Sequence, residues 1–86
     1  MTFEEIYALV QKRKEEMPEG SSTTALFRLG TDGIGKKLLE EAAESWMAAR
    51  FESKDAQSLE LSQVLYYVAC LMVEKNLSLN EVYAKL

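Results

Sequence analysis

The fold is decided by residues 33–75, which read GIGKKLLEEAAESWMAARFESKDAQSLELSQVLYYVACLMVEK. This stretch contains no proline, and its apolar residues recur at helical spacing on both sides of the polar turn Ser53-Lys54-Asp55. We expect one helix from about Gly33 to Glu52 and a second from about Ala56 to Lys75. A connection this short places two helices antiparallel and in contact, so the sequence predicts an all-α bundle built on a helical hairpin.

Shorter helices are predicted on both flanks of this hairpin. Capping-box patterns occur at Thr2 with Glu5 and at Ser78 with Glu81. The first pattern opens a helix that should end near Met17, because a proline and a glycine follow it. The second opens a last helix that we extend to the final residue. The expected total is four to five helices.

A break is predicted between the first helix and the hairpin. The polar run Ser21-Ser22-Thr23-Thr24 can cap a short helix through Leu29, and Gly30 is a typical helix stop. Thr31 or Asp32 would then cap the long helix that follows.

The composition indicates a single small domain, residues 1–86, that is completed by a second copy. A chain of 86 residues buries only about 60–65% of its unfolded surface. Yet 48% of the residues are apolar. We therefore expect part of the core to be completed in a homodimer.

Several classes of protein are disfavoured. The net charge is −4 and no basic run exceeds three residues, so a nucleic-acid partner is not expected. There is no apolar span of about 18 residues, so we expect neither a membrane anchor nor a secretory signal. The single cysteine, Cys70, suits a reducing cytoplasm. The absence of histidine removes His-based zinc sites and Ser-His-Asp triads.

The first long helix carries an acidic cluster. Lys37, Glu40, Glu41 and Glu44 fall within an arc of roughly 100° on a helix that turns about 100° per residue. The opposite side is broadly apolar and comprises Leu38, Leu39, Ala42, Ala43, Trp46 and Ala49. An ordinary solvated face would look the same, and this alternative stays open on the first helix alone.

The second long helix carries a matching polar stripe. Residues 64–73 contain no charge, whereas Glu60, Gln63, Tyr67 and Glu74 align within roughly 60° of one another. Glu60 alone could reflect only the preference for negative charge in the first turn of a helix.

The two polar stripes can face each other across the antiparallel pair. Oxygen ligands from Glu41, Glu44, Glu60 and the Gln63 amide would suit Mg²⁺ or Mn²⁺. A water activated there, with Glu40 as base, could attack a phosphorus atom.

The same residues carry a resemblance to a known family. Glu40-Glu41-x-x-Glu44, fifteen further residues and Glu60-x-x-Gln63 resemble the Glu-Glu-x-x-Glu…Glu-x-x-Asp pattern of the all-α nucleoside triphosphate pyrophosphatases, the MazG-like superfamily. Within it, residues 20–86 are similar to phosphoribosyl-ATP pyrophosphatase. The residues that support this narrower match are Ser21, Thr23, Leu26, Gly30, Ile34, Lys37–Glu44, Ala48-Ala49, Leu65-Tyr66 and the ending from Leu77 to Leu86.

The resemblance implies an enzyme of histidine biosynthesis. Its members hydrolyse 1-(5-phosphoribosyl)-ATP to 1-(5-phosphoribosyl)-AMP and pyrophosphate, as metal-dependent helical homodimers. It implies metal ligation by Glu41, Glu44 and Glu60, and assistance by Glu40. Lys37 would contact phosphate or hold the glutamates. Ser21 and Thr23 would belong to a loop on the substrate side.

Two basic residues near the hairpin turn are further candidates for contact with substrate. Arg50 and Lys54, near the turn, could contact substrate phosphates or could be ordinary surface residues.

The sequence departs from the family pattern at three places. The family's Asp is Gln63 here, its aromatic-His pair is Tyr66-Tyr67, and its Tyr after Ser21 is Ser22. An amide oxygen brings no charge, so a degenerate, weakly active member is one alternative. Hydrolysis of dUTP or a noncanonical triphosphate is another, and a non-catalytic dimerisation module is a third.

Overall fold

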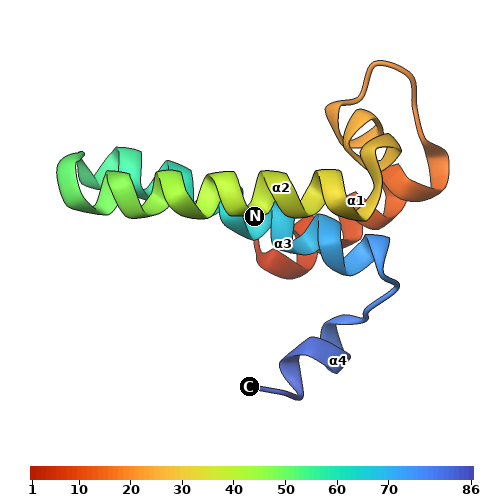
Figure 1. The fold of residues 1–86 in the computed structure, drawn as a ribbon. Coiled ribbons are helices and arrows are strands. Elements are labelled where there is room, and N and C mark those ends of the chain that lie inside the picture. Colours follow the sequence, from red (N-terminus) through yellow and green to blue (C-terminus); the bar gives the residue numbers. More distant parts are fainter.

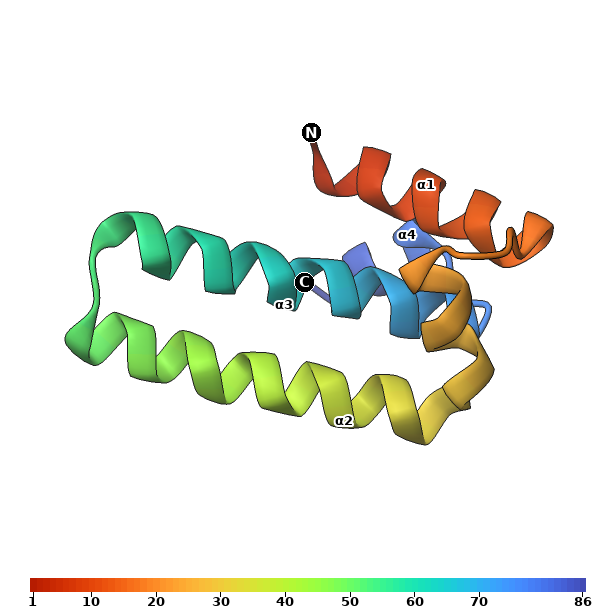
Figure 2. The same ribbon diagram turned by 90° about the horizontal axis from the view of Figure 1, so that it is seen from above.

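The computed structural model describes all residues, 1–86, and contains four helices and no strand. The helices are α1 (Phe3–Glu16), α2 (Ser22–Phe51), α3 (Lys54–Glu74) and α4 (Leu79–Tyr83). The two longest, α2 and α3, run antiparallel as a hairpin, and α1 and α4 lie at the end away from its turn (Figures 1 and 2). The predicted all-α fold built on two long antiparallel helices is confirmed.

Both predicted capping boxes form. The Thr2 side chain accepts a hydrogen bond from the Glu5 amide while the Glu5 carboxylate accepts one from the Thr2 amide, and Ser78 and Glu81 do the same. α1 ends where Met17 adopts a left-handed conformation, as its sequence predicted. The last helix is shorter than expected, because the final amides bond to carbonyls only three residues back in a tight turn.

The predicted break at Gly30 is present inside α2. Gly30 has φ 74° and ψ −169°, a combination that is open essentially to glycine alone. Ser21 caps the first segment by accepting a hydrogen bond from the Thr24 amide. The expected cap at Thr31 or Asp32 is wrong: Thr31 instead donates its hydroxyl hydrogen to Glu74 of α3, 3.3 Å away.

The hairpin turn is tighter than predicted. The Ser53 side chain accepts a hydrogen bond from the Ala56 amide and so caps α3, which already begins at Lys54. Lys54 and Asp55 therefore belong to the helix rather than to the turn. Asp55 supplies a negative charge in the first turn, which suits the helix dipole.

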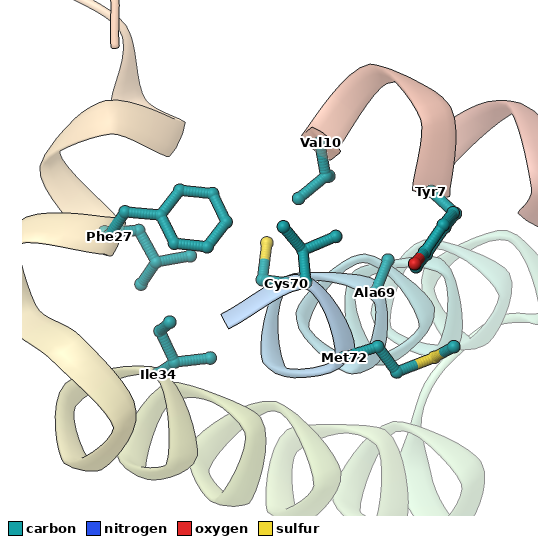
Figure 3. Close-up of a cluster of buried hydrophobic side chains, with 9 residues drawn as sticks. Tyr7, Val10, Phe27, Ile34, Ala69, Cys70 and Met72 are labelled. Atoms are coloured by element: carbon teal, nitrogen blue, oxygen red, sulfur yellow. The ribbon is translucent and has the colours of Figure 1, made fainter. Parts of the chain in front are cut away.

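The hydrophobic core lies where α1, both segments of α2 and the C-terminal half of α3 meet (Figure 3). Val10, Ile34 and Cys70 are buried almost completely, one from each of the three helices. Each is small enough to interdigitate at close range, and together they hold the base of the hairpin. The buried cluster consists of Tyr7, Val10, Leu26, Phe27, Ile34, Ala69, Cys70, Met72 and Val73.

The rest of the hairpin, residues 37–62, projects beyond this core, and we call it the hairpin arm (Figure 2). Its outer surface carries large exposed apolar side chains: Trp46 is 66% exposed and Phe51 72% exposed. The expected apolar face of the first long helix is therefore not covered by the chain itself, and Leu39, Ala42, Ala43 and Ala49 are exposed too. The side of α2 that faces α3 instead carries Ile34, Leu38, Glu41, Ser45 and Ala48.

None of the four helices is both long enough and apolar enough to span a bilayer.

Candidate metal centre

Three glutamates from two helices converge in the hairpin arm. Glu41 and Glu44 come from α2, and Glu60 comes from α3. Each offers one carboxylate oxygen, and these oxygens all lie within 4.8 Å of one another. The structure thus brings together three of the four residues that the sequence suggested as metal ligands.

The inward position of Glu41 follows from the register of α2. Ile34, Glu41 and Ala48 are separated by seven residues each, about two turns, so they share one side of the helix. Ser45 lies one turn after Glu41 and donates its hydroxyl hydrogen to the Glu41 carbonyl at 2.9 Å. Small, buried Ser45 and Ala48 let α3 approach closely, so the side chain of Glu41 is held between the helices.

The cluster is electrostatically unfavourable by itself. The pKa of Glu41 is raised to about 7, first by burial and then by the neighbouring carboxylates of Glu60 and Glu44. Glu41 Oε2 and Glu60 Oε2 are both buried without a hydrogen-bond partner. Buried carboxylate oxygens without donors are costly, and a divalent cation satisfies them. The residues present therefore fit a hard cation with oxygen ligands.

Three further predicted site residues surround the cluster. Glu40 is exposed and forms an ion pair with Lys37, whose Nζ lies 4.0 Å from Glu40 Oε2. Gln63 is half-buried on α3, one turn after Glu60. Its proximity to that carboxylate follows from helical spacing, and its role as a ligand stays a prediction.

The fourth member of the predicted polar stripe, Glu74, belongs to a different cluster. It accepts hydrogen bonds from Lys14 Nζ at 3.2 Å and from the Thr31 hydroxyl at 3.3 Å. Glu74 thereby ties α1 and the residue after Gly30 to the end of α3. Glu74 lies nearly four turns beyond Glu60, too far along α3 to join the acidic cluster.

The residues expected on the substrate side have structural partners. Ser21 caps α2, and buried Thr23 shares a short hydrogen bond between its hydroxyl and that of Tyr66. Arg50 stacks over the Phe51 ring, with 4.8 Å from its guanidinium carbon to the ring centroid. Arg50 and Lys54 are each six residues from the nearest cluster glutamate, about 9 Å along a helix. Contact of these four residues with substrate stays a prediction.

An aromatic pair, Tyr66 and Tyr67, lies beside the cluster. The sequence had not predicted that these two residues form part of a site. Tyr66 and Tyr67 pack edge to face, with ring centroids 5.1 Å apart. Tyr67 shares one side of α3 with Glu60 and Gln63. Burial raises the pKa of Tyr67, and the negative charge of Glu41 raises it further. In the sequence, the two consecutive tyrosines one turn after Gln63 were the only sign of this pair. The residues that face them come from α2, and no local pattern connects the two helices at this point.

The tyrosines form part of a cleft of about 290 Å³ beside the acidic cluster. Its lining residues are Ser22, Ala25, Leu26, Leu29, Lys37, Tyr66 and Tyr67. Only Lys37 among them was a predicted site residue. Ala25 and Leu29 could not be anticipated, because they reach the tyrosines only through the change of direction at Gly30.

Comparison with known protein families agrees with this fold and acidic cluster. The family model described as phosphoribosyl-ATP pyrophosphohydrolase matches residues 3–86, nearly the whole chain. The match includes both long helices, the three convergent glutamates and the cleft beside them. The chain belongs to the phosphoribosyl-ATP pyrophosphohydrolase family, a family of hydrolases acting on phosphoanhydrides.

Proposed function

We propose that this protein hydrolyses 1-(5-phosphoribosyl)-ATP to 1-(5-phosphoribosyl)-AMP and pyrophosphate in histidine biosynthesis, and that the reaction requires Mg²⁺ or Mn²⁺. Family membership supports the reaction class. The observation that supports metal dependence is the convergence of Glu41, Glu44 and Glu60, with two of their oxygens buried and unpaired. Such a cluster is hard to explain without a cation, because three nearby carboxylates repel one another.

In this proposal Glu41, Glu44 and Glu60 would hold the cation, and the Gln63 amide oxygen would be a further ligand. When bound, the cation would neutralise phosphate charge and lower the pKa of a coordinated water. Glu40 is exposed beside the cluster and takes up the proton of the attacking water. The water oxygen forms a bond to phosphorus while the bridging bond between the α- and β-phosphates breaks, so pyrophosphate leaves.

Lys37 is the cation of the chain best placed for the substrate. It pairs with Glu40 and also lines the adjoining cleft. A lysine ammonium binds phosphate as a compact point charge. Lys37 therefore compensates negative charge on the phosphates and orients Glu40, whereas Ser21, Thr23, Arg50 and Lys54 have supporting roles in this proposal.

The active form in this proposal is a homodimer located in the cytoplasm. The supporting observation is the apolar outer surface of the hairpin arm, where Leu39 is 71% and Trp46 66% exposed. Large exposed apolar patches usually mark an interaction surface. The single cysteine is free and buried, which suits a reducing compartment.

The test is pyrophosphate release from phosphoribosyl-ATP, with and without Mg²⁺, beside ATP, dUTP and dCTP. We expect release only from phosphoribosyl-ATP and expect EDTA to abolish it. Release from dUTP or dCTP instead would keep the metal site and reject the substrate. Full activity in EDTA would reject metal dependence, and no release from any nucleotide by a folded dimer would reject catalysis.

A further inference from the structure

The cleft beside the acidic cluster has three walls from separate parts of the chain. Residues 22–29 come from the segment of α2 before Gly30, Lys37 comes from the segment after it, and Tyr66 and Tyr67 come from α3. The first two walls face the third only because α2 changes direction at Gly30, where φ is 74°. The break in α2 thus creates a concave surface at a point where a straight helix would pass by.

The chemistry of the cleft differs sharply from that of the acidic cluster. Five of its seven lining residues are hydrophobic, and Lys37 is the only one that carries a charge. Its volume of about 290 Å³ lies just below the usual range of about 300–1,000 Å³ for small-molecule sites. A triphosphate would find too few donors here, whereas a flat aromatic heterocycle would find apolar walls and the rings of Tyr66 and Tyr67.

The cleft and the cluster are adjacent and share residues along their border. Lys37 lines the cleft and lies 4.0 Å from Glu40. Tyr67 lines the cleft and lies within electrostatic reach of Glu41. A ligand in which a planar base is joined to an anionic phosphate chain could therefore occupy both sites at once, with Lys37 between the base and the chain.

We infer that the cleft binds the purine base of the nucleotide substrate while its phosphates extend to the carboxylate cluster. This inference rests on the proposed function for the identity of the substrate. It assigns specificity to Ala25, Leu29, Tyr66 and Tyr67, and it assigns the α-phosphate to Lys37. The purine base and the metal would then bind to separate surfaces on either side of Lys37.

The test fills the cleft without touching the cluster. Ala25 is exposed on a helix, so Ala25→Leu should fold normally, and Ala8→Leu on α1 is the matched control. Loss of base stacking should raise the KM for phosphoribosyl-ATP and the inhibition constant of phosphoribosyl-AMP about tenfold or more. The inhibition constant of magnesium pyrophosphate, which has no base, should stay unchanged, as should all three values in Ala8→Leu.

Two results would overturn the inference. In one, Ala25→Leu leaves the KM and the phosphoribosyl-AMP constant unchanged. In the other, it weakens pyrophosphate inhibition equally, which would mean general damage to the site. Circular dichroism melting verifies that the variant is folded.

A binding measurement separates this inference from the proposed reaction. Titration of the ¹⁵N-labelled protein with phosphoribosyl-AMP should shift the amide signals of Ala25, Leu29 and Tyr66, whether or not turnover occurs. If wild-type protein releases no pyrophosphate but shows these shifts, the proposed function fails and the cleft remains a base site. If turnover is normal but these signals do not move, only the cleft assignment fails.

Discussion

The same two helices meet in two different ways along their length. At the base of the hairpin, α2 and α3 meet through Ile34 and Cys70, which are both buried and apolar. In the hairpin arm they meet through Glu41 and Glu60, whose carboxylates have buried oxygens without partners. Apolar burial at the base of the hairpin stabilises the fold, whereas the arm contains carboxylates that repel one another. A stable base thus allows the arm to keep an acidic cluster that would not assemble by itself.

The largest effect should follow from removing one cluster carboxylate. Glu44→Gln should lower kcat roughly 1,000-fold, because it removes an anionic oxygen from the proposed metal site. The melting temperature should not fall, since one repulsive charge is lost. Glu52→Gln, at the exposed end of the arm, is the control and should be fully active. Full activity in Glu44→Gln would mean that the cluster is not the catalytic centre.

A truncation in the base should affect stability instead of chemistry. Ile34 is completely buried, so Ile34→Ala should lower the free energy of unfolding by about 2–5 kcal/mol in denaturant titration. At temperatures where the variant is folded, its magnesium affinity should match the wild type. The arm counterpart is Leu39→Ala, which should cost less than about 1 kcal/mol at protein concentrations below dimerisation. An equal loss of unfolding free energy in Ile34→Ala and Leu39→Ala would contradict the division between base and arm.

A charge on the outer surface of the arm should disrupt assembly. Trp46 is 66% exposed in the single chain, and tryptophan is a frequent energetic centre of interfaces. Trp46→Glu should weaken the proposed dimer about 30-fold or more, measured by sedimentation equilibrium. Leu9→Glu, on α1, should leave the association constant unchanged. A wild-type protein that sediments as a monomer would disprove this role for the arm.

The pH dependence of stability should reverse with metal. The folded pKa of Glu41, about 7, lies above its usual value, so the folded state retains a proton that the unfolded state has released. The stabilisation that the protonated Glu41 gives the folded state is therefore present at low pH and is lost as pH rises through 7. The metal-free melting temperature should therefore fall between about pH 5 and 8. Saturating Mg²⁺ should reverse that trend, because it binds the ionised carboxylates.

The control for this measurement is Glu41→Gln, which should flatten the metal-free profile. A profile of wild-type protein that is already flat would mean that Glu41 titrates normally in the folded chain.

The smallest effect is expected at Gln63. Gln63→Asp restores the acidic residue of the family pattern and adds a charge next to Glu60. Magnesium affinity, measured by calorimetry, should increase severalfold, because ligand charge raises affinity for a hard cation. Unchanged affinity and turnover would mean that Gln63 is not a direct ligand. Gln57→Asp, earlier on α3, controls for the general effect of an added charge.

The features that the sequence predicted correctly depend on local chemistry. Two capping boxes, the stop at Gly30 and the short hairpin turn each arise within a few residues. The convergence of Glu41, Glu44 and Glu60 was also predictable, because helical period and an antiparallel turn determine it. Family resemblance then supplied the chemistry that spacing alone does not specify.

The features that escaped prediction depend on tertiary contacts. Glu74 shares a helical stripe with Glu60, yet Lys14 and Thr31 reach it from elsewhere in the chain. The cleft combines Ala25 and Leu29 with two tyrosines about forty residues later, and no local pattern joins them. The dimer, the ligand role of Gln63 and the substrate contacts of Ser21, Thr23, Arg50 and Lys54 stay predictions.

Burial of the only cysteine makes this chain convenient for site-directed labelling. Burial raises the pKa of the Cys70 thiol to about 11, so almost none of it is the reactive thiolate at neutral pH. A cysteine introduced on the surface would react with a maleimide probe while Cys70 stays unmodified. Spin labels placed along the arm in the wild-type background would then report distances between two copies, without first mutating a native residue.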